Sequence, residues 1–192
     1  TEGEEILWQG RPDWRALARE SLMLNWVVVY FLVLALWQVA LKASTLPLGG
    51  SRNAGVPYLL LGFGAAAIIM VIAWAQAKTT VYTITSARVV MRMGVALTMT
   101  LNLPFRELGN ASLDLRRSGT GTIALETMGK TRISYLVLWP HARPWRMNPA
   151  QPALRCIPDA ERVASLLAEA ADARVNTPQI APLAPSEALA AE

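Results

Sequence analysis

The chain of 192 residues has a single cysteine, Cys156, and a single histidine, His141. One cysteine excludes an intramolecular disulfide and any metal site built from several cysteines. One histidine excludes every site that needs two, and neither residue stands in a spacing typical of a catalytic constellation. We therefore expect an inert thiol, a loop histidine without a partner, no cofactor, no metal and no enzymatic activity.

Charge is also scarce. Charged residues make up 17% of the chain, whereas soluble domains carry roughly 25%. Apolar types reach 53% and the mean hydropathy is +0.30, the opposite of the balance in a disordered chain. The net charge of +4 is small and no nucleic-acid motif accompanies it, so we expect no nucleic-acid partner.

Two long runs, residues 22–41 and 56–77, contain no charged residue at all. As a helix, either run is long enough to cross the roughly 30 Å hydrocarbon core of a bilayer. A pair of buried core helices is the alternative, but charge-free runs of this length are rare in water-soluble domains. The runs predict a transmembrane hairpin over residues 22–77, and because no ionisable side chain lies inside either run, transport chemistry is disfavoured.

Aromatic and basic residues lie near the ends of both runs, as at membrane interfaces. Six Lys or Arg residues flank the outer ends and two lie in the connecting loop, which predicts that both termini are cytoplasmic. The residues expected at the membrane interface are Trp14, Arg15, Arg19, Trp26, Trp37, Tyr58 and Trp74.

The second run carries a stripe of small residues at helical spacing: Gly62, Ala66, Ala73 and Ala77. Small residues let helix backbones approach closely in lipid. The stripe therefore contacts either the first run, or another membrane protein, or a second copy of the chain, so a homodimer is conceivable.

After Lys78 the pattern changes to alternation of apolar and polar residues, as in 80–85, 88–93, 95–103, 111–116 and 133–139, with a proline-rich connector over 140–158. An amphipathic helix fits 159–174, and the tail 175–192 is expected to be mobile. The predicted organisation is an N-terminal cytoplasmic segment 1–21, the hairpin 22–77, an antiparallel β domain 78–174 and the tail. The fold class is thus α+β, a membrane hairpin followed by an open β-barrel plugged by its C-terminal helix.

Several of these segments resemble the bacterial pleckstrin-homology domain. They are Tyr82–Thr85, Arg88–Gly94, Leu103–Phe105, Gly119–Ile123, the helix start Ile157–Ala160 and the N-terminal segment Glu4–Pro12. The runs 3–20, 79–105 and 135–147, with LWPHARPWR at 138–146 as the most distinctive part, also resemble the photosynthetic-complex assembly proteins of purple bacteria. The chain begins at Thr1 without an initiator methionine, which leaves open whether residues precede it.

The narrower resemblance implies a non-enzymatic assembly factor in the photosynthetic intracytoplasmic (inner) membrane. Its partners would be the reaction-centre and light-harvesting polypeptides and the lipid bilayer. A generic membrane-anchored adaptor that contacts anionic lipid or a protein is the alternative. The candidate partner-binding residues are the small-residue stripe together with Trp139, His141, Arg143 and Trp145.

Six basic residues of the β domain could form a surface for anionic lipid or an acidic partner, or simply a solvated strand face. These residues are Arg88, Arg92, Arg116, Arg117, Lys130 and Arg132.

Overall fold

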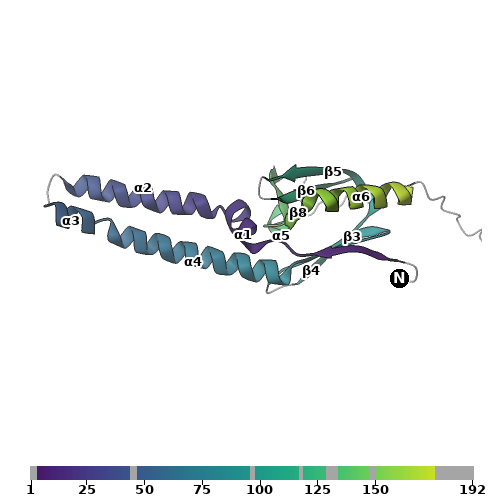
Figure 1. Cartoon of the computed structure of the whole chain (residues 1–192), viewed down its shortest axis with the longest axis horizontal. Helices are drawn as coiled ribbons and strands as arrows, with labels where there is room; N and C mark the ends of the chain where they lie inside the picture. Colours follow the sequence, from purple (N-terminus) through teal and green to yellow (C-terminus); the bar gives the residue numbers. More distant parts are fainter. Residues whose placement is uncertain are drawn as a thin grey trace, which may run out of the picture.

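The computed structural model describes residues 4–43, 47–95, 98–116, 119–128, 134–147 and 150–175. A long helical hairpin extends from one end of a domain made of two β-sheets and a C-terminal helix (Figure 1). The predicted tail beyond Val175 lies outside the described residues.

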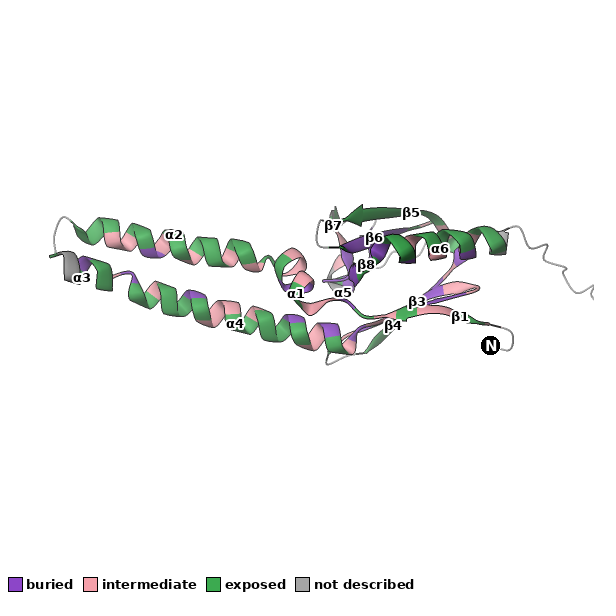
Figure 2. Cartoon of the chain, viewed as in Figure 1, coloured by how far each residue is buried: buried purple, intermediate pink, exposed green. Residues whose placement is uncertain are grey.

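The hairpin consists of α2 (Leu24–Ala43), the short α3 (Leu48–Asn53) and α4 (Val56–Thr79). Both long helices are long and apolar enough to cross a membrane. Only 6% and 11% of the positions in their most apolar windows are buried, which is unlike the core helices of a soluble protein. Figure 2 shows that exposed residues run along the full length of both helices.

Before the hairpin, α1 (Trp14–Ala16) and a π-helical turn, η1 (Leu17–Ser21), lead the chain from the β domain to α2. Asp13 caps α1, because its carboxylate accepts hydrogen bonds from the backbone N–H groups of Arg15 and Ala16. Met23 has a φ of 53° and separates η1 from α2. A residue in the left-handed region cannot continue a right-handed helix, so the chain turns at this point.

The first sheet has the order β1-β2-β3-β4 and is antiparallel throughout. Its strands are β1 (Ile6–Gly10), β2 (Val81–Thr85), β3 (Arg88–Met93) and β4 (Met99–Pro104). The N-terminal segment expected over residues 1–21 thus supplies, through β1, an edge strand of this sheet. An ion pair of 2.8 Å between Glu4 and Arg88 fastens the start of the segment.

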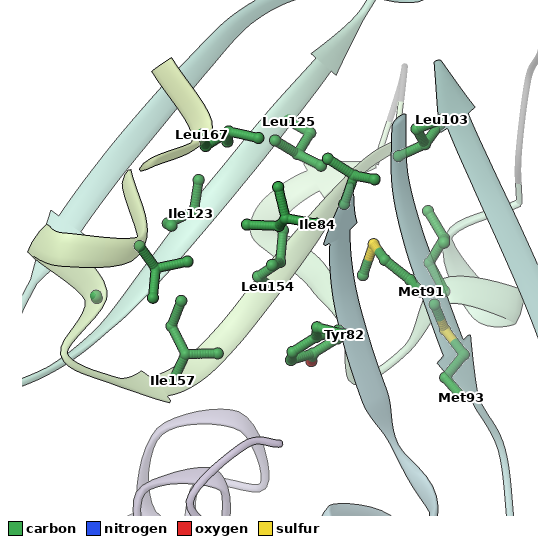
Figure 3. Packing of buried hydrophobic residues seen from close by; sticks show 14 of the residues in the cluster. Tyr82, Ile84, Met91, Met93, Leu103, Ile123, Leu125, Leu154, Ile157 and Leu167 are labelled. Atoms are coloured by element: carbon green, nitrogen blue, oxygen red, sulfur yellow. The ribbon is translucent and has the colours of Figure 1, made fainter. Parts of the chain in front are cut away.

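The second sheet has the order β5-β6-β8-β7. Its strands are β5 (Leu108–Leu115), β6 (Thr120–Thr127), β7 (Ala142–Met147) and β8 (Ala150–Pro158), and η2 (Phe105–Glu107) links the two sheets. The strands form two four-stranded sheets in the described part of the chain, so the single open barrel of the prediction is wrong. The apolar faces of the two sheets pack together with α6 (Ala160–Val175) around the core (Figure 3). In the described part of the chain the two sheets are separate and their strands do not close a ring.

Two predicted segments have a different structure. Residues 135–138, expected within a strand, form the short helix α5 (Tyr135–Leu138). An apolar run of four residues is compatible both with the two-residue period of a strand and with the 3.6-residue period of a helix. In the structure it forms a helical turn, and Leu138 lies in the core. The proline-rich connector 140–158 contains β7 and β8. Pro144 lies in the edge strand β7, Pro158 ends β8 and Pro152 lies beside irregular pairing, and at such positions a missing N–H is tolerated.

Candidate functional site

The hairpin meets the β domain through a small apolar contact. Leu17 of η1, Ala77 of α4 and Cys156 of β8 are buried against one another. The backbone N–H of Asp13 donates a 2.8 Å hydrogen bond to the carbonyl of Cys156. The base of the hairpin is therefore packed on β8.

A β-bulge shapes β8 at this contact. Gly121 and Ile123 are two positions apart on β6, whereas their partners on β8, Ile157 and Leu154, are three positions apart. Cys156 takes a φ of 52° within the bulge. Bulges redirect side chains, and here the two residues of the bulge, Arg155 and Cys156, both reach the base of the hairpin.

Arg155 is an arginine buried in this base, with 6% of its surface exposed. Its guanidinium donates to the carbonyl of Pro140 at 3.4 Å and to the carbonyl of Glu20 at 3.5 Å. Its Nε is buried and has no hydrogen-bond partner among the residues that the structure describes. A buried cation whose described contacts are carbonyls at long distance is incompletely compensated.

A cleft of about 520 Å³ opens beside Arg155, between the hairpin and the second sheet. We call it the junction cleft. Its lining combines the buried cation Arg155 and the polar residues Glu20 and Ser21 with less polar side chains from both parts of the chain: Leu22, Met23, Ile69, Ile72, Tyr135, Trp139 and Pro144. Such a lining is suited to an amphipathic ligand with an anionic group.

A buried polar network lies next to the cleft. His141 Nδ1 is 2.6 Å from the Tyr82 hydroxyl, and His141 Nε2 is 3.2 Å from the Thr80 hydroxyl. The backbone N–H of Arg155 donates to the Tyr82 oxygen at 3.4 Å. Burial, with a smaller contribution from the positive charge of Arg155, lowers the pKa of His141 to about 4. Burial also raises the pKa of Tyr82, so both rings are neutral at pH 7.

The thiol of Cys156 is fully buried, and its Sγ lies 3.8 Å from the Glu20 carboxylate. Burial and then the nearby Glu20 charge raise the pKa of this thiol to about 12. A thiol that stays protonated is a poor nucleophile and metal ligand. This environment agrees with the inert thiol expected from the sequence.

The small-residue stripe of α4 is used mostly within the chain. Gly62 lies against Phe31 of α2, where a Cβ on Gly62 would come within 2.7 Å of the Phe31 Cβ. Ala73 is fully buried and Ala77 packs on Leu17, while Ala66 is half-buried. Gly62 thus makes the contact with the first run that the sequence offered as one alternative, while contact of the stripe with another membrane protein or a second copy stays a prediction.

The four candidate partner-binding residues of the distinctive segment 138–146 do not share one environment. Trp139 is 47% exposed and lines the junction cleft, whereas His141, expected as a loop histidine, is buried in the polar network. The correction for His141 arises because the turn before β7 places this residue beneath β2. Arg143 is half-buried and donates to the Gln151 side chain at 3.0 Å. Trp145 lies in β7, and its side chain lies outside what the structure describes.

Most of the predicted interface residues are on the surface of the hairpin and its base. Trp26, Trp37 and Trp74 are largely exposed, while Trp14 and Tyr58 are half-buried. Two of the tryptophans stack with cations: Arg15 lies 5.2 Å from the Trp14 ring and Lys78 lies 4.8 Å from the Trp74 ring. Arg19 is exposed on the same base.

The predicted basic surface is partly neutralised. Arg88 pairs with Glu4, and Arg116 lies 3.6 Å from Glu20 and 3.4 Å from Asp114. Arg92 is exposed. Arg117, Lys130 and Arg132 lie outside the described residues.

Sequence reasoning missed Arg155, the residue around which the junction cleft is built. A signal was present, because Arg155 is the one charge inside the otherwise apolar run 153–157. A lone charge in a buried strand needs a compensating partner, which makes it a candidate functional residue.

Comparisons with known proteins place these features in a family. Residues 23–171 match the protein family described as Bacterial PH domain. The chain is also 46% identical, over 184 residues, to an uncharacterized 23.7 kDa protein in the puhA 5′ region of Rhodobacter capsulatus, covering 93% of this chain and 85% of that protein. No solved structure matches the chain.

Proposed function

The chain belongs to the bacterial PH-domain family, and on this premise we propose that it is a non-enzymatic, membrane-anchored assembly factor for the photosynthetic reaction centre and its light-harvesting ring. The hairpin is inserted in the bacterial inner membrane with both termini in the cytoplasm. It holds membrane polypeptides through protein–protein contacts, while the β domain stays at the membrane surface.

The observation that carries this proposal is the exposed apolar hairpin fixed to the β domain (Figure 2). Trp26, Leu60, Phe63 and Val71 are each more than 60% exposed. An apolar surface of this extent needs lipid or protein to cover it. The relative in the puhA 5′ region supports a photosynthetic partner, since that position lies near reaction-centre genes.

The test is isolation of the tagged full chain from photosynthetic membranes in mild detergent, followed by near-infrared absorption and peptide identification. We expect bacteriochlorophyll together with reaction-centre or antenna polypeptides. A tagged, unrelated two-span membrane protein expressed at the same level is the control. A colourless preparation that carries unrelated proteins would contradict the proposal.

A second function, a general membrane adaptor, is favoured by the exposed cations Arg15 and Arg19 at the base of the hairpin. Such cations are attracted to anionic headgroups next to the membrane. The two functions differ in a strain that lacks the chain. An assembly factor predicts a several-fold loss of reaction-centre absorption that the restored gene reverses, whereas a general adaptor predicts normal pigment content.

A further inference from the structure

We propose that the junction cleft binds one phospholipid. Its phosphate lies at Arg155, and the part of its acyl chains nearest the headgroup lies along α4. The inference rests on the membrane placement proposed above, but not on any photosynthetic partner. It assigns a ligand to a part of the fold where the hairpin and the β domain meet.

The charge of the cleft favours a phosphate. The buried guanidinium of Arg155 has two long contacts to carbonyls, and its Nε has no hydrogen-bond partner within the described ranges of the chain. A phosphate oxygen would supply the charge-assisted hydrogen bond that the carbonyls do not. Glu20 lines the same cleft, but its carboxylate is 3.6 Å from Arg116 Nε, which offsets its negative charge.

The apolar part of the lining favours a lipid over a free phosphate ion. Met23, Ile69, Ile72 and Trp139 form this part, and Met23, Ile72 and Trp139 are each more than 40% exposed. The surface continues along α4 to Ile68, which lies one helical turn before Ile72 and is 62% exposed. Hydrocarbon would cover this strip, whereas a free anion would leave it in contact with water.

The position of the cleft along the length of the hairpin also matches the level of a phospholipid headgroup in a bilayer. Gly62 faces Phe31 and Gly55 faces Val39, which sets the register of α4 against α2 and brings Ile69 level with the first residues of α2. Arg155 lies beyond that end, on the side of the β domain. A phosphate at Arg155 would therefore lie just outside the hydrocarbon core, where phospholipid phosphates lie.

The test is native mass spectrometry of the delipidated full chain in detergent, titrated with dioleoylphosphatidylglycerol. We expect one tightly bound lipid. Arg155→Gln should weaken its binding at least ten-fold by removing the cation. Ile72→Trp, on the exposed face of α4, should weaken it by filling the apolar part of the cleft without disturbing the buried network. Arg106→Gln, which removes an exposed arginine of η2 that does not line the cleft, is the matched control and should bind as the wild type does.

Two further probes separate the parts of the ligand. Dioleoylglycerol lacks the phosphate, and inorganic phosphate lacks the chains, so both should bind at least ten-fold more weakly than the phospholipid. Equal binding of the phospholipid to the wild type and both cleft variants, or equal binding of dioleoylglycerol, overturns the proposal. Inorganic phosphate that binds as tightly as the lipid also overturns it. Because the purified chain is used alone, these outcomes are independent of whether pigment proteins co-purify.

Discussion

His141 is a titratable residue whose role is decided by the groups around it. It hydrogen-bonds Tyr82 and Thr80 in the interior and stays neutral because burial opposes its charged form. The unfolded chain binds a proton at this residue near pH 6.5, whereas the folded chain does so only near pH 4. Acid therefore favours the unfolded chain.

At the residue scale we predict that His141 makes the fold acid-sensitive. Its contribution to stability is fully present above pH 6.5 and is lost as the pH falls to about 4, a total of about 3 kcal/mol. His141→Gln should be less stable than the wild type at pH 7.5 but should lose less on acidification. Thermal unfolding of the detergent-solubilised chain at pH 7.5 and 5.0 measures this difference. Parallel losses in the two proteins would contradict the prediction.

Among the elements, the α2–α4 pair depends on one close approach. Gly62 lets the backbone of α4 lie against the Phe31 side chain, with no room for a methyl group. Gly64, two residues later, faces open space, because a Cβ at this position would have no neighbouring atom within 4 Å. The two glycines therefore form a natural matched pair for testing helix packing.

At the element scale we predict that Gly62→Ala lowers the free energy of unfolding of the hairpin by about 1–3 kcal/mol, because the helices must separate to admit the methyl group. Gly64→Ala should be neutral or slightly stabilising, since alanine is the better helix former. Titration of the detergent-solubilised chain with sodium dodecyl sulfate, followed by circular dichroism, gives both values. The same loss in both variants would show that the Phe31 contact is not the cause.

For the whole molecule, the arrangement places the hairpin tip and the β domain at opposite ends (Figure 1). If the hairpin spans the membrane, these ends lie in different compartments. Asn53 in α3 and Ser165 in α6 are exposed at the two ends, and the native thiol of Cys156 is buried with a pKa raised to about 12. Cys156 should therefore contribute little background in thiol labelling.

At the scale of the molecule we predict that Asn53→Cys is labelled by a membrane-impermeant maleimide in intact spheroplasts. Ser165→Cys should be labelled only after the membrane is broken. The unsubstituted chain is the control and should stay unlabelled in both conditions. Labelling of Ser165→Cys in intact spheroplasts would reverse the proposed orientation, and labelling of both variants would rule out a two-span topology.

Local patterns determined most of the elements. The charge-free runs 22–41 and 56–77 correspond to α2 and α4, the alternation at 88–93 corresponds to β3, and the amphipathic run 159–174 corresponds to α6. These predictions succeeded because hydrophobic periodicity reflects which face of a helix or strand is buried. The family was also recognisable from such local segments.

Tertiary structure alone decided how distant segments meet. Residues 6–10 pair with β2 across more than 70 positions, and the bulge in β8 brings Arg155 and Cys156 against η1. His141 is buried only because the turn before β7 carries it beneath Tyr82. The pattern along the sequence records whether a residue prefers water or an apolar interior. It does not record which residue will satisfy a buried polar group, since that depends on contacts between segments far apart in the chain.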